Sequence, residues 1–102
     1  MKHAGAAALD RLEPVLRRVR ALPQLRERSR GVFYLRTRAF LHFHEDPKGL
    51  FADLRIGATW SRARVSTVAE RARLLRRIDD GLGRATRRKT TARARRAPPP
   101  SA

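Results

Sequence analysis

The sequence predicts an α+β fold: a helix, a four-stranded antiparallel meander, a second helix and a disordered basic C-terminal tail. Three observations support this prediction. Apolar residues recur at helical spacing near the N-terminus, strand-like segments fill residues 31–66, and a capping motif precedes a second helical pattern. Two helices on one face of a short antiparallel sheet form a stable two-layer domain. We expect the domain to span residues 1–82 and the tail to span residues 83–102.

The N-terminal segment has the pattern of an amphipathic helix. Pro14 lies within this pattern and lacks an amide hydrogen, so it either starts a helix or makes a longer helix irregular. We expect one helix from about residue 5 to residue 21, followed by a polar loop from Gln24 to Arg30. The apolar residues recur at spacings of three and four, which places them on one face: Leu9, Leu12, Val15, Leu16, Val19 and Leu22.

The segment GVFYLRTRAFLHFHED, residues 31–46, predicts the first two strands because it is rich in residues that favour strands. We expect a two-residue turn at Thr37-Arg38, which pairs Phe33 with His42. Both sides of this hairpin are apolar near its middle, so the sequence leaves open which face is buried. A sheet covered on both faces, by packing or by a partner, would explain the pattern.

Two further strands follow a strong turn at residues 46–49, with sequence DPKG. Leu50 to Ile56 alternates between apolar and polar residues and is expected to be the third strand. After a second turn at residues 57–59, Trp60 to Ser66 alternates in the same way and is expected to be the fourth. Trp60 and Tyr34 have rings that can stack on nucleic-acid bases, but we expect core packing to use them first.

Thr67 and Glu70 match a capping box, which predicts a second helix from Val68. We expect this helix to bury Val68 and to end at Gly81 and Gly83. The segment after Gly83 is rich in Arg, Ala, Thr and Pro. It has too few apolar residues to offset its ordering entropy by burial, so we expect it to be disordered.

Charge is the most unusual property of the composition. The chain has 25 Lys and Arg against 9 Asp and Glu, which gives a formal net charge of +16. Such a chain attracts polyanions through its long-range field and through counterion release. Residues 82–102 contain no acid and seven cations: Arg84, Arg87, Arg88, Lys89, Arg93, Arg95 and Arg96.

The composition also narrows the function classes. Cysteine is absent, which excludes disulfides and thiolate chemistry. No segment approaches the roughly 18 apolar residues of a membrane span, and the N-terminus lacks the apolar region of a signal peptide. We therefore expect a cytoplasmic protein without a membrane span, located at the nucleoid if it binds DNA.

His42 and His44 form the most specific local pattern. On a strand they point to the same side, roughly 6–7 Å apart, and two imidazoles so placed can share a metal ion if a third ligand is present. They can equally be ordinary half-exposed strand residues, with Glu45 and Asp46 as the polar start of the next turn. The sequence contains no nucleophile–base–orienter set and no glycine-rich phosphate loop. We therefore expect no catalytic residues, no cofactor and no metal.

Four stretches carry a resemblance to known families: ALPQL before the sheet, GVFYLRTRAFLHF, GLFADLRI, and the final helix from Val68. Through them, residues 21–78 resemble the small MmcQ/YjbR-like proteins, which implies an α+β fold and a predicted DNA-binding role. The chain is also similar to short actinobacterial "luciferase-domain" proteins, in which a strand ending His-x-His leads to an Asp-bearing strand. The matching residues are His42, His44 and Asp53. Neither resemblance supplies catalytic residues.

The leading functional prediction is a non-enzymatic protein that associates non-specifically with nucleic acid through backbone phosphates. The seven C-terminal cations would carry this binding, and Arg55, Arg62 and Arg64 would add a patch if their strands pair. Two alternatives stay open. The first is a small-molecule or metal-binding module, or an enzyme, around the two histidines and Asp53. The second is a protein-interaction subunit whose partner covers a spare apolar face of the sheet.

Overall fold

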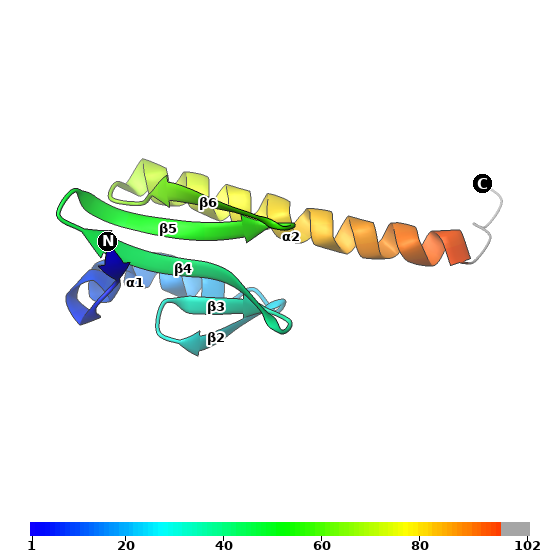
Figure 1. Cartoon of the computed structure of the whole chain (residues 1–102), viewed down its shortest axis with the longest axis horizontal. Helices are drawn as coiled ribbons and strands as arrows, with labels where there is room; N and C mark the ends of the chain where they lie inside the picture. Colours follow the sequence, from blue (N-terminus) through cyan, green and yellow to red (C-terminus); the bar gives the residue numbers. More distant parts are fainter. Residues whose placement is uncertain (97–102) are drawn as a thin grey trace.

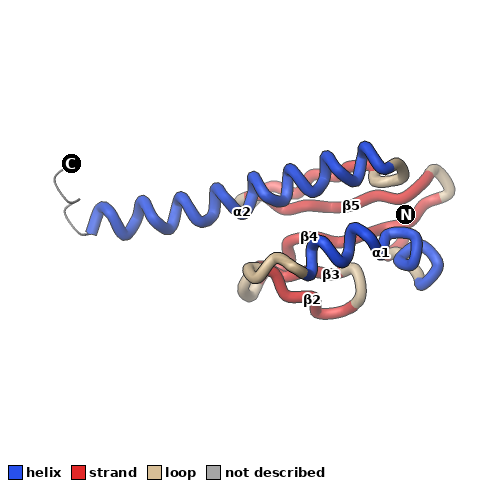
Figure 2. The backbone as a smooth tube through the Cα atoms, turned by 180° about the vertical axis from the view of Figure 1, so that it is seen from behind, coloured by secondary structure: helices blue, strands red, loops and turns tan. Residues whose placement is uncertain are grey.

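The computed structural model describes the backbone of residues 1–96 and the side chains of residues 1–83. One antiparallel sheet forms the first layer, and both helices pack on the same face of it (Figures 1 and 2). The α+β class is therefore confirmed. The elements in chain order are β1 (Lys2–His3), α1 (Ala6–Arg20), β2 (Leu25–Ser29), β3 (Val32–Leu35), β4 (Arg38–Asp46), β5 (Gly49–Ile56), β6 (Thr59–Arg64) and α2 (Val68–Arg96).

The prediction of a four-stranded meander between two helices was wrong, because the sheet has six strands. Five of them follow the order β2-β3-β4-β5-β6, and β1 pairs with β4. The short β1 contains two residues, too few to produce a periodic pattern. The sequence of β2 is LRERS, which reads as a polar loop because it has a single apolar residue. The strand β1 depends on its pairing with the distant β4, and β2 depends on its hairpin with β3 and on contacts with α1.

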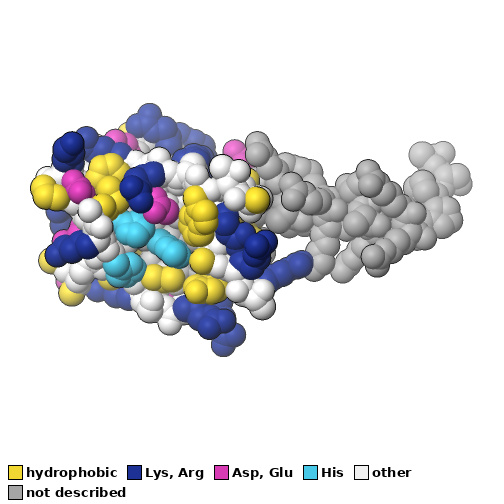
Figure 3. Space-filling model, in the orientation of Figure 1, with side chains coloured by type: hydrophobic (Ala, Val, Ile, Leu, Met, Phe, Trp, Pro, Cys, Tyr) yellow, Lys and Arg dark blue, Asp and Glu magenta, His cyan; other side chains and the backbone are white. Residues whose placement is uncertain are grey.

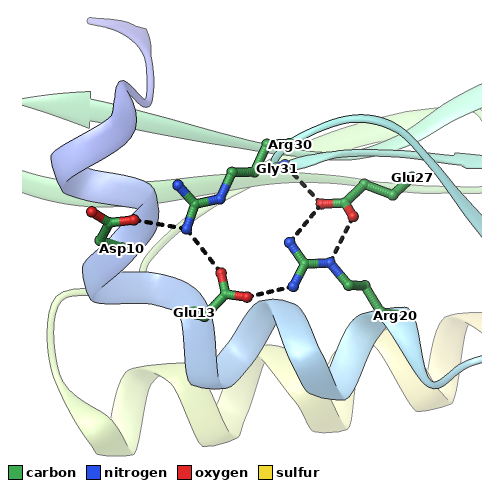
Figure 4. A network of polar contacts seen from close by, with 6 residues as sticks. All are labelled: Asp10, Glu13, Arg20, Glu27, Arg30 and Gly31. Carbon is green, nitrogen blue, oxygen red and sulfur yellow. Dashed lines mark hydrogen bonds and ion pairs between the residues drawn. The ribbon is translucent and has the colours of Figure 1, made fainter.

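An ion-pair network holds β2 against α1 (Figure 4). Glu27 lies opposite Phe33 in the β2–β3 register, which directs it toward the helix layer. There its Oε1 accepts a hydrogen bond of 2.6 Å from Arg20 Nε, and its Oε2 accepts one of 3.1 Å from the Gly31 N–H. Arg20 also donates to Glu13, whose other oxygen lies 2.9 Å from Arg30 Nη2. An inward charge of this kind also discourages other chains from pairing with an edge strand.

The predicted register of the first hairpin was also wrong. The turn lies at Arg36-Thr37 and not at Thr37-Arg38, and Arg36 adopts a positive φ of 58°. Phe33 pairs with Leu41, and a bulge in the ladder leaves Phe40 as the extra residue of β4. All three of these side chains are buried, at 2% exposure or less. The bulge settles which face of the sheet meets the helices, a question that the sequence left open.

The core lies between the sheet and the helices. The helical stripe predicted for α1 is confirmed, since its apolar residues from Leu9 to Val19 are buried. Pro14 is exposed inside α1, and the helix axis bends in its first half (Figure 4). The largest fully buried side chains come from both layers: Phe33, Phe43, Leu12, Leu16, Leu41, Leu54, Leu74, Ile78, Val19 and Val65.

The capping box at the start of α2 is confirmed. The Glu70 N–H donates to Thr67 Oγ1 over 3.1 Å, and the Thr67 N–H donates to Glu70 Oε1 over 2.9 Å. Val68 was expected to be buried but is 80% exposed. Leu74 and Ile78 make the contact with the core, one turn apart on the face of α2 that meets the sheet.

The prediction that α2 ends at Gly81 and Gly83 was wrong, because the helix continues to Arg96. Gly81 is a packing residue: a Cβ there would lie 3.3 Å from Ile56 Cγ1, so glycine lets the helix approach β5 closely. Ala, Arg and Lys after Gly83 favour helix, and no proline occurs before Pro98. The predicted disordered tail is therefore corrected for residues 83–96, which extend past the sheet as a helix (Figures 1 and 2). Residues 97–102 lie outside the described residues.

Neither helix in the described part of the chain is long and apolar enough to cross a membrane. The longer one, α2, has 29 residues but is strongly polar, with many arginines along its length.

We predict that Gly31→Ala destabilises the fold more than Gly57→Ala. Both glycines have a positive φ, of 80° and 66°, so each substitution introduces a backbone strain of about 1–2 kcal/mol. A Cβ at Gly31 would also lie 2.6 Å from Leu9 Cδ2, whereas a Cβ at Gly57 has no neighbour within 4 Å. Overpacking against Leu9 adds about 1–3 kcal/mol at Gly31 alone. Urea denaturation of both variants measures the difference, and equal costs would contradict this account of the turn.

Candidate functional site

The face of the sheet opposite the helices, which we call the open face, collects most of the polar and aromatic candidates. The strand register places His3 beside His44, His42 beside Asp53, and Asp53 beside Arg62. On the same face, Arg55 lies beside Trp60. Figure 3 shows the three histidines clustered on this face, with hydrophobic and basic side chains around them.

Four rings form a continuous row across the open face. The ring centroids of His3 and His44 are 6.2 Å apart, and those of His44 and His42 are 6.1 Å apart. The indole of Trp60 continues the row, with its centroid 5.2 Å from that of His42. Since His42 is on β4 and Trp60 is on β6, the indole reaches over β5. The row therefore crosses the sheet from β1 to β6.

Asp53 is the acidic centre of the open face. Its two oxygens accept hydrogen bonds of 2.8 and 3.0 Å from Arg62, which is the bidentate geometry of a strong pair. This pairing holds the pKa of Asp53 below its ordinary value, against the opposing effect of burial, and it raises the pKa of Arg62. Nε2 of His44 lies 3.1 Å from Asp53 Oδ2 but is not aligned for a hydrogen bond.

The two predicted histidines are half-buried beneath this arrangement. Nε2 of His42 and Nε2 of His44 are shielded from solvent and have no hydrogen-bond partner in the described part of the chain. Burial lowers the pKa of His42, and the neighbouring His44 lowers it further. His42 is therefore a neutral ring near pH 7, which suits it to packing and stacking.

The residues around the histidine pair do not complete a metal site. Among the described residues, no group of three His, Cys, Asp or Glu side chains is arranged to hold a metal ion. Glu45 Oε2 instead accepts a 2.6 Å hydrogen bond from the Gly5 N–H ahead of α1. Asp46 accepts a 3.0 Å bond from the Lys48 N–H and so shapes the β4–β5 turn. Both acids therefore have structural contacts.

The structure brings Arg55, Arg62 and Arg64 to the open face, as the predicted strand pairing required. Their partners differ. Arg62 is neutralised by Asp53, whereas Arg64 Nε lies 3.9 Å from Glu70 and its side chain is more than half exposed. Arg55 donates to the Ala39 carbonyl over 2.7 Å and lies 5.8 Å above the Trp60 ring. Arg55 thus keeps positive charge on this face, whereas the Arg64 side chain contacts Ser66 and Glu70 at its edge.

The predicted C-terminal cations lie outside the described side chains. Their backbone belongs to α2, which carries them along a helix that extends past the sheet. The residues concerned are Arg84, Arg87, Arg88, Lys89, Arg93, Arg95 and Arg96.

Two members of the ring row were missed or misplaced by the sequence pattern. Nothing in the sequence pattern indicates a role for His3, because the two-residue β1 is defined only by its pairing with β4. Trp60 was expected to pack in the core but is 44% exposed. The sequence did contain a signal for this exposure. Trp60 pairs with Arg55, and Arg55 alternates along β5 with the buried core residues, so both side chains lie on the face opposite the core.

No protein-family model, no curated protein and no solved structure matches this chain.

We predict that the protein loses stability as the pH falls from 6.5 through the folded-state pKa of His42. Its pKa in the folded state lies below the ordinary value of 6.5, so the unfolded chain takes up a proton first. The stabilisation is complete above pH 6.5 and is lost as the pH falls through the folded pKa. Glu45 and Asp53 also have lowered pKa values, but their effect appears only below their ordinary values of 4.5 and 3.8.

Urea denaturation at several pH values in this range, on the natural chain and on His42→Phe, measures the effect. The substitution is expected to flatten the dependence, whatever its effect on absolute stability. Equal pH dependence in the two proteins would show that His42 does not titrate as described.

Proposed function

We propose that this protein associates non-specifically with nucleic acid through contacts between its C-terminal cations and backbone phosphates. The observation that carries the proposal is the charge of residues 82–102, which include seven cations and no acid. Phosphate contacts of this kind provide affinity without reading sequence. The resemblance to MmcQ/YjbR-like proteins, with their predicted DNA-binding role, points in the same direction. A location at the nucleoid is part of this proposal.

The charge distribution of the folded body supports the proposal. Seven of the nine acids have ion-pair contacts within the described side chains, so they are already occupied by nearby cations. The excess positive charge of the chain is therefore not cancelled by a complementary acidic surface. The seven acids are Asp10, Glu13, Glu27, Glu45, Asp46, Asp53 and Glu70.

The direction of α2 also supports the proposal. The helix packs on the sheet through Leu74, Ile78 and Leu82, and its backbone then leaves the body (Figures 1 and 2). Residues 84–96 are thus carried past the sheet, and Asp79 and Asp80 are the last acids before them. A strand of nucleic acid can approach such a helix along its length without displacing any part of the core.

We predict that replacing all seven C-terminal cations by Gln weakens duplex DNA binding by more than about tenfold. Gln retains helix propensity, so the change removes charge while preserving α2. Seven phosphate contacts contribute about −6 to the log–log dependence of the binding constant on salt, so the slope should become shallower by about that amount. Fluorescence anisotropy with a labelled duplex at several salt concentrations gives both quantities.

A charge-matched control separates position from net charge. It replaces seven exposed arginines of the body by Gln, none of which forms an ion pair within the described side chains. This control should keep most of the salt slope. Equal losses in the two variants, or no loss in the C-terminal variant, would refute the proposal. The control residues are Arg11, Arg17, Arg18, Arg36, Arg38, Arg73 and Arg76.

A further inference from the structure

The open face presents flat rings to solvent that the fold does not require to be there. Trp60 is 44% exposed. Among the described residues, the other exposed large hydrophobic side chains are Met1 and Val68. Its indole lies over β5 and ends a row of rings that continues through His42. A tryptophan in this position gives up part of the stabilisation from burial, since full burial of a large apolar side chain stabilises a fold by about 1.5–3 kcal/mol.

Guanidinium groups accompany the aromatic rings of the open face. Arg55 lies 5.8 Å from the Trp60 ring centroid, and Arg28 lies 4.8 Å from that of Tyr34. Tyr34 is on the same face, because its register partner Ala39 lies on β4 on the side opposite the core. Each of these rings therefore offers a π surface with a cation beside it.

These charges distinguish between the candidate partners of the face. The chain has a formal net charge of +16, and Arg55 lies beside the exposed Trp60 ring, so charge complementarity favours a polyanionic partner for this face. A ligand that supplies both flat rings and negative charge matches the surface better. Unpaired nucleic-acid bases stack on aromatic side chains and guanidinium planes, and their phosphates pair with arginine.

We propose that the open face binds single-stranded nucleic acid, with bases stacked on Trp60 and Tyr34 and phosphates beside Arg55. This inference deepens the proposed function and rests on it for the class of ligand, but it uses a different surface from the C-terminal cations. The bases of a duplex are stacked on one another and are not available to the rings. The open face therefore selects unpaired strands, while the C-terminal cations contact any phosphate backbone.

Trp60 is the only tryptophan of the chain, so its fluorescence reports on this face directly. Titration of the full chain with an oligo-dT of about 15 nucleotides, a length within reach of one small domain, should quench it to saturation. A duplex of equal length and heparin bind as polyanions without unpaired bases, so they should leave most of the fluorescence unchanged. Equal quenching by all three ligands would overturn the proposal.

Substitutions test the rings separately from the charge. Trp60→Leu should weaken oligo-dT binding by about 5- to 100-fold, measured by anisotropy of labelled DNA, while Trp60→Phe should retain most of it. Tyr34→Leu should produce a smaller loss in the same direction. Duplex binding should stay unchanged in all three. Val68→Ala is the matched control, since Val68 is 80% exposed at the start of α2 and should have no effect.

The outcomes distinguish this inference from the proposed function. If Trp60→Leu binds oligo-dT as tightly as the natural chain does, the open-face site is overturned, regardless of the result for the C-terminal variant. Unchanged duplex binding in the C-terminal variant would refute the proposed function. The substitutions at Trp60 and Tyr34 would still test the open face separately. A change in oligomeric state in Trp60→Leu, with oligo-dT binding intact, would assign the face to a second copy of the chain and would also overturn the inference.

Discussion

The bulge at Phe40 is the constraint on which the rest of the structure depends. Side chains alternate between the faces of a strand, so a shift of one residue would exchange every side chain between the core and the open face. With the bulge in place, Phe33, Leu41 and Phe43 meet the helices. Without it, the histidines of β4 would face the core, and Leu41 and Phe43 would lose a burial that stabilises the fold by about 1.5–3 kcal/mol for each side chain. The ring row and the hydrophobic core are thus two consequences of one register.

Asp53 is what allows so many basic groups to share the open face. It lies between His42 and Arg62 in the register and contacts His44 through space. Its carboxylate offsets the positive charge of Arg62 and, through its low pKa, remains ionised at neutral pH. The pair therefore acts as a neutral unit within the row of rings. The net charge of the face comes from arginines at other positions, so Asp53 shapes the surface without making it acidic.

Local patterns were predictable from the sequence, and contacts between distant segments were not. The stripe of α1 and the capping box at Thr67 each depend on residues within a few positions, and both are confirmed. The strand β2 depends on Glu27 reaching Arg20 of α1, and nothing local in LRERS indicates that contact. Gly81 alone predicts the end of a helix, whereas the structure shows that it allows close packing against Ile56. At the site, His42, His44 and Asp53 were found in the pattern, whereas His3 and the exposed Trp60 depended on strand pairing.

The two candidate binding surfaces differ in what they can contribute. In the proposed function, the C-terminal cations provide an attraction that any phosphate backbone satisfies, so alone they would concentrate the protein on all nucleic acids alike. The open face has few free charges but has rings that require unpaired bases. Because α2 joins the cationic segment to the core through Leu74 and Ile78, one surface engaged with a strand holds the other near it. If both surfaces bind as proposed, a modest preference of the rings would direct the unselective attraction of the cations toward single-stranded regions.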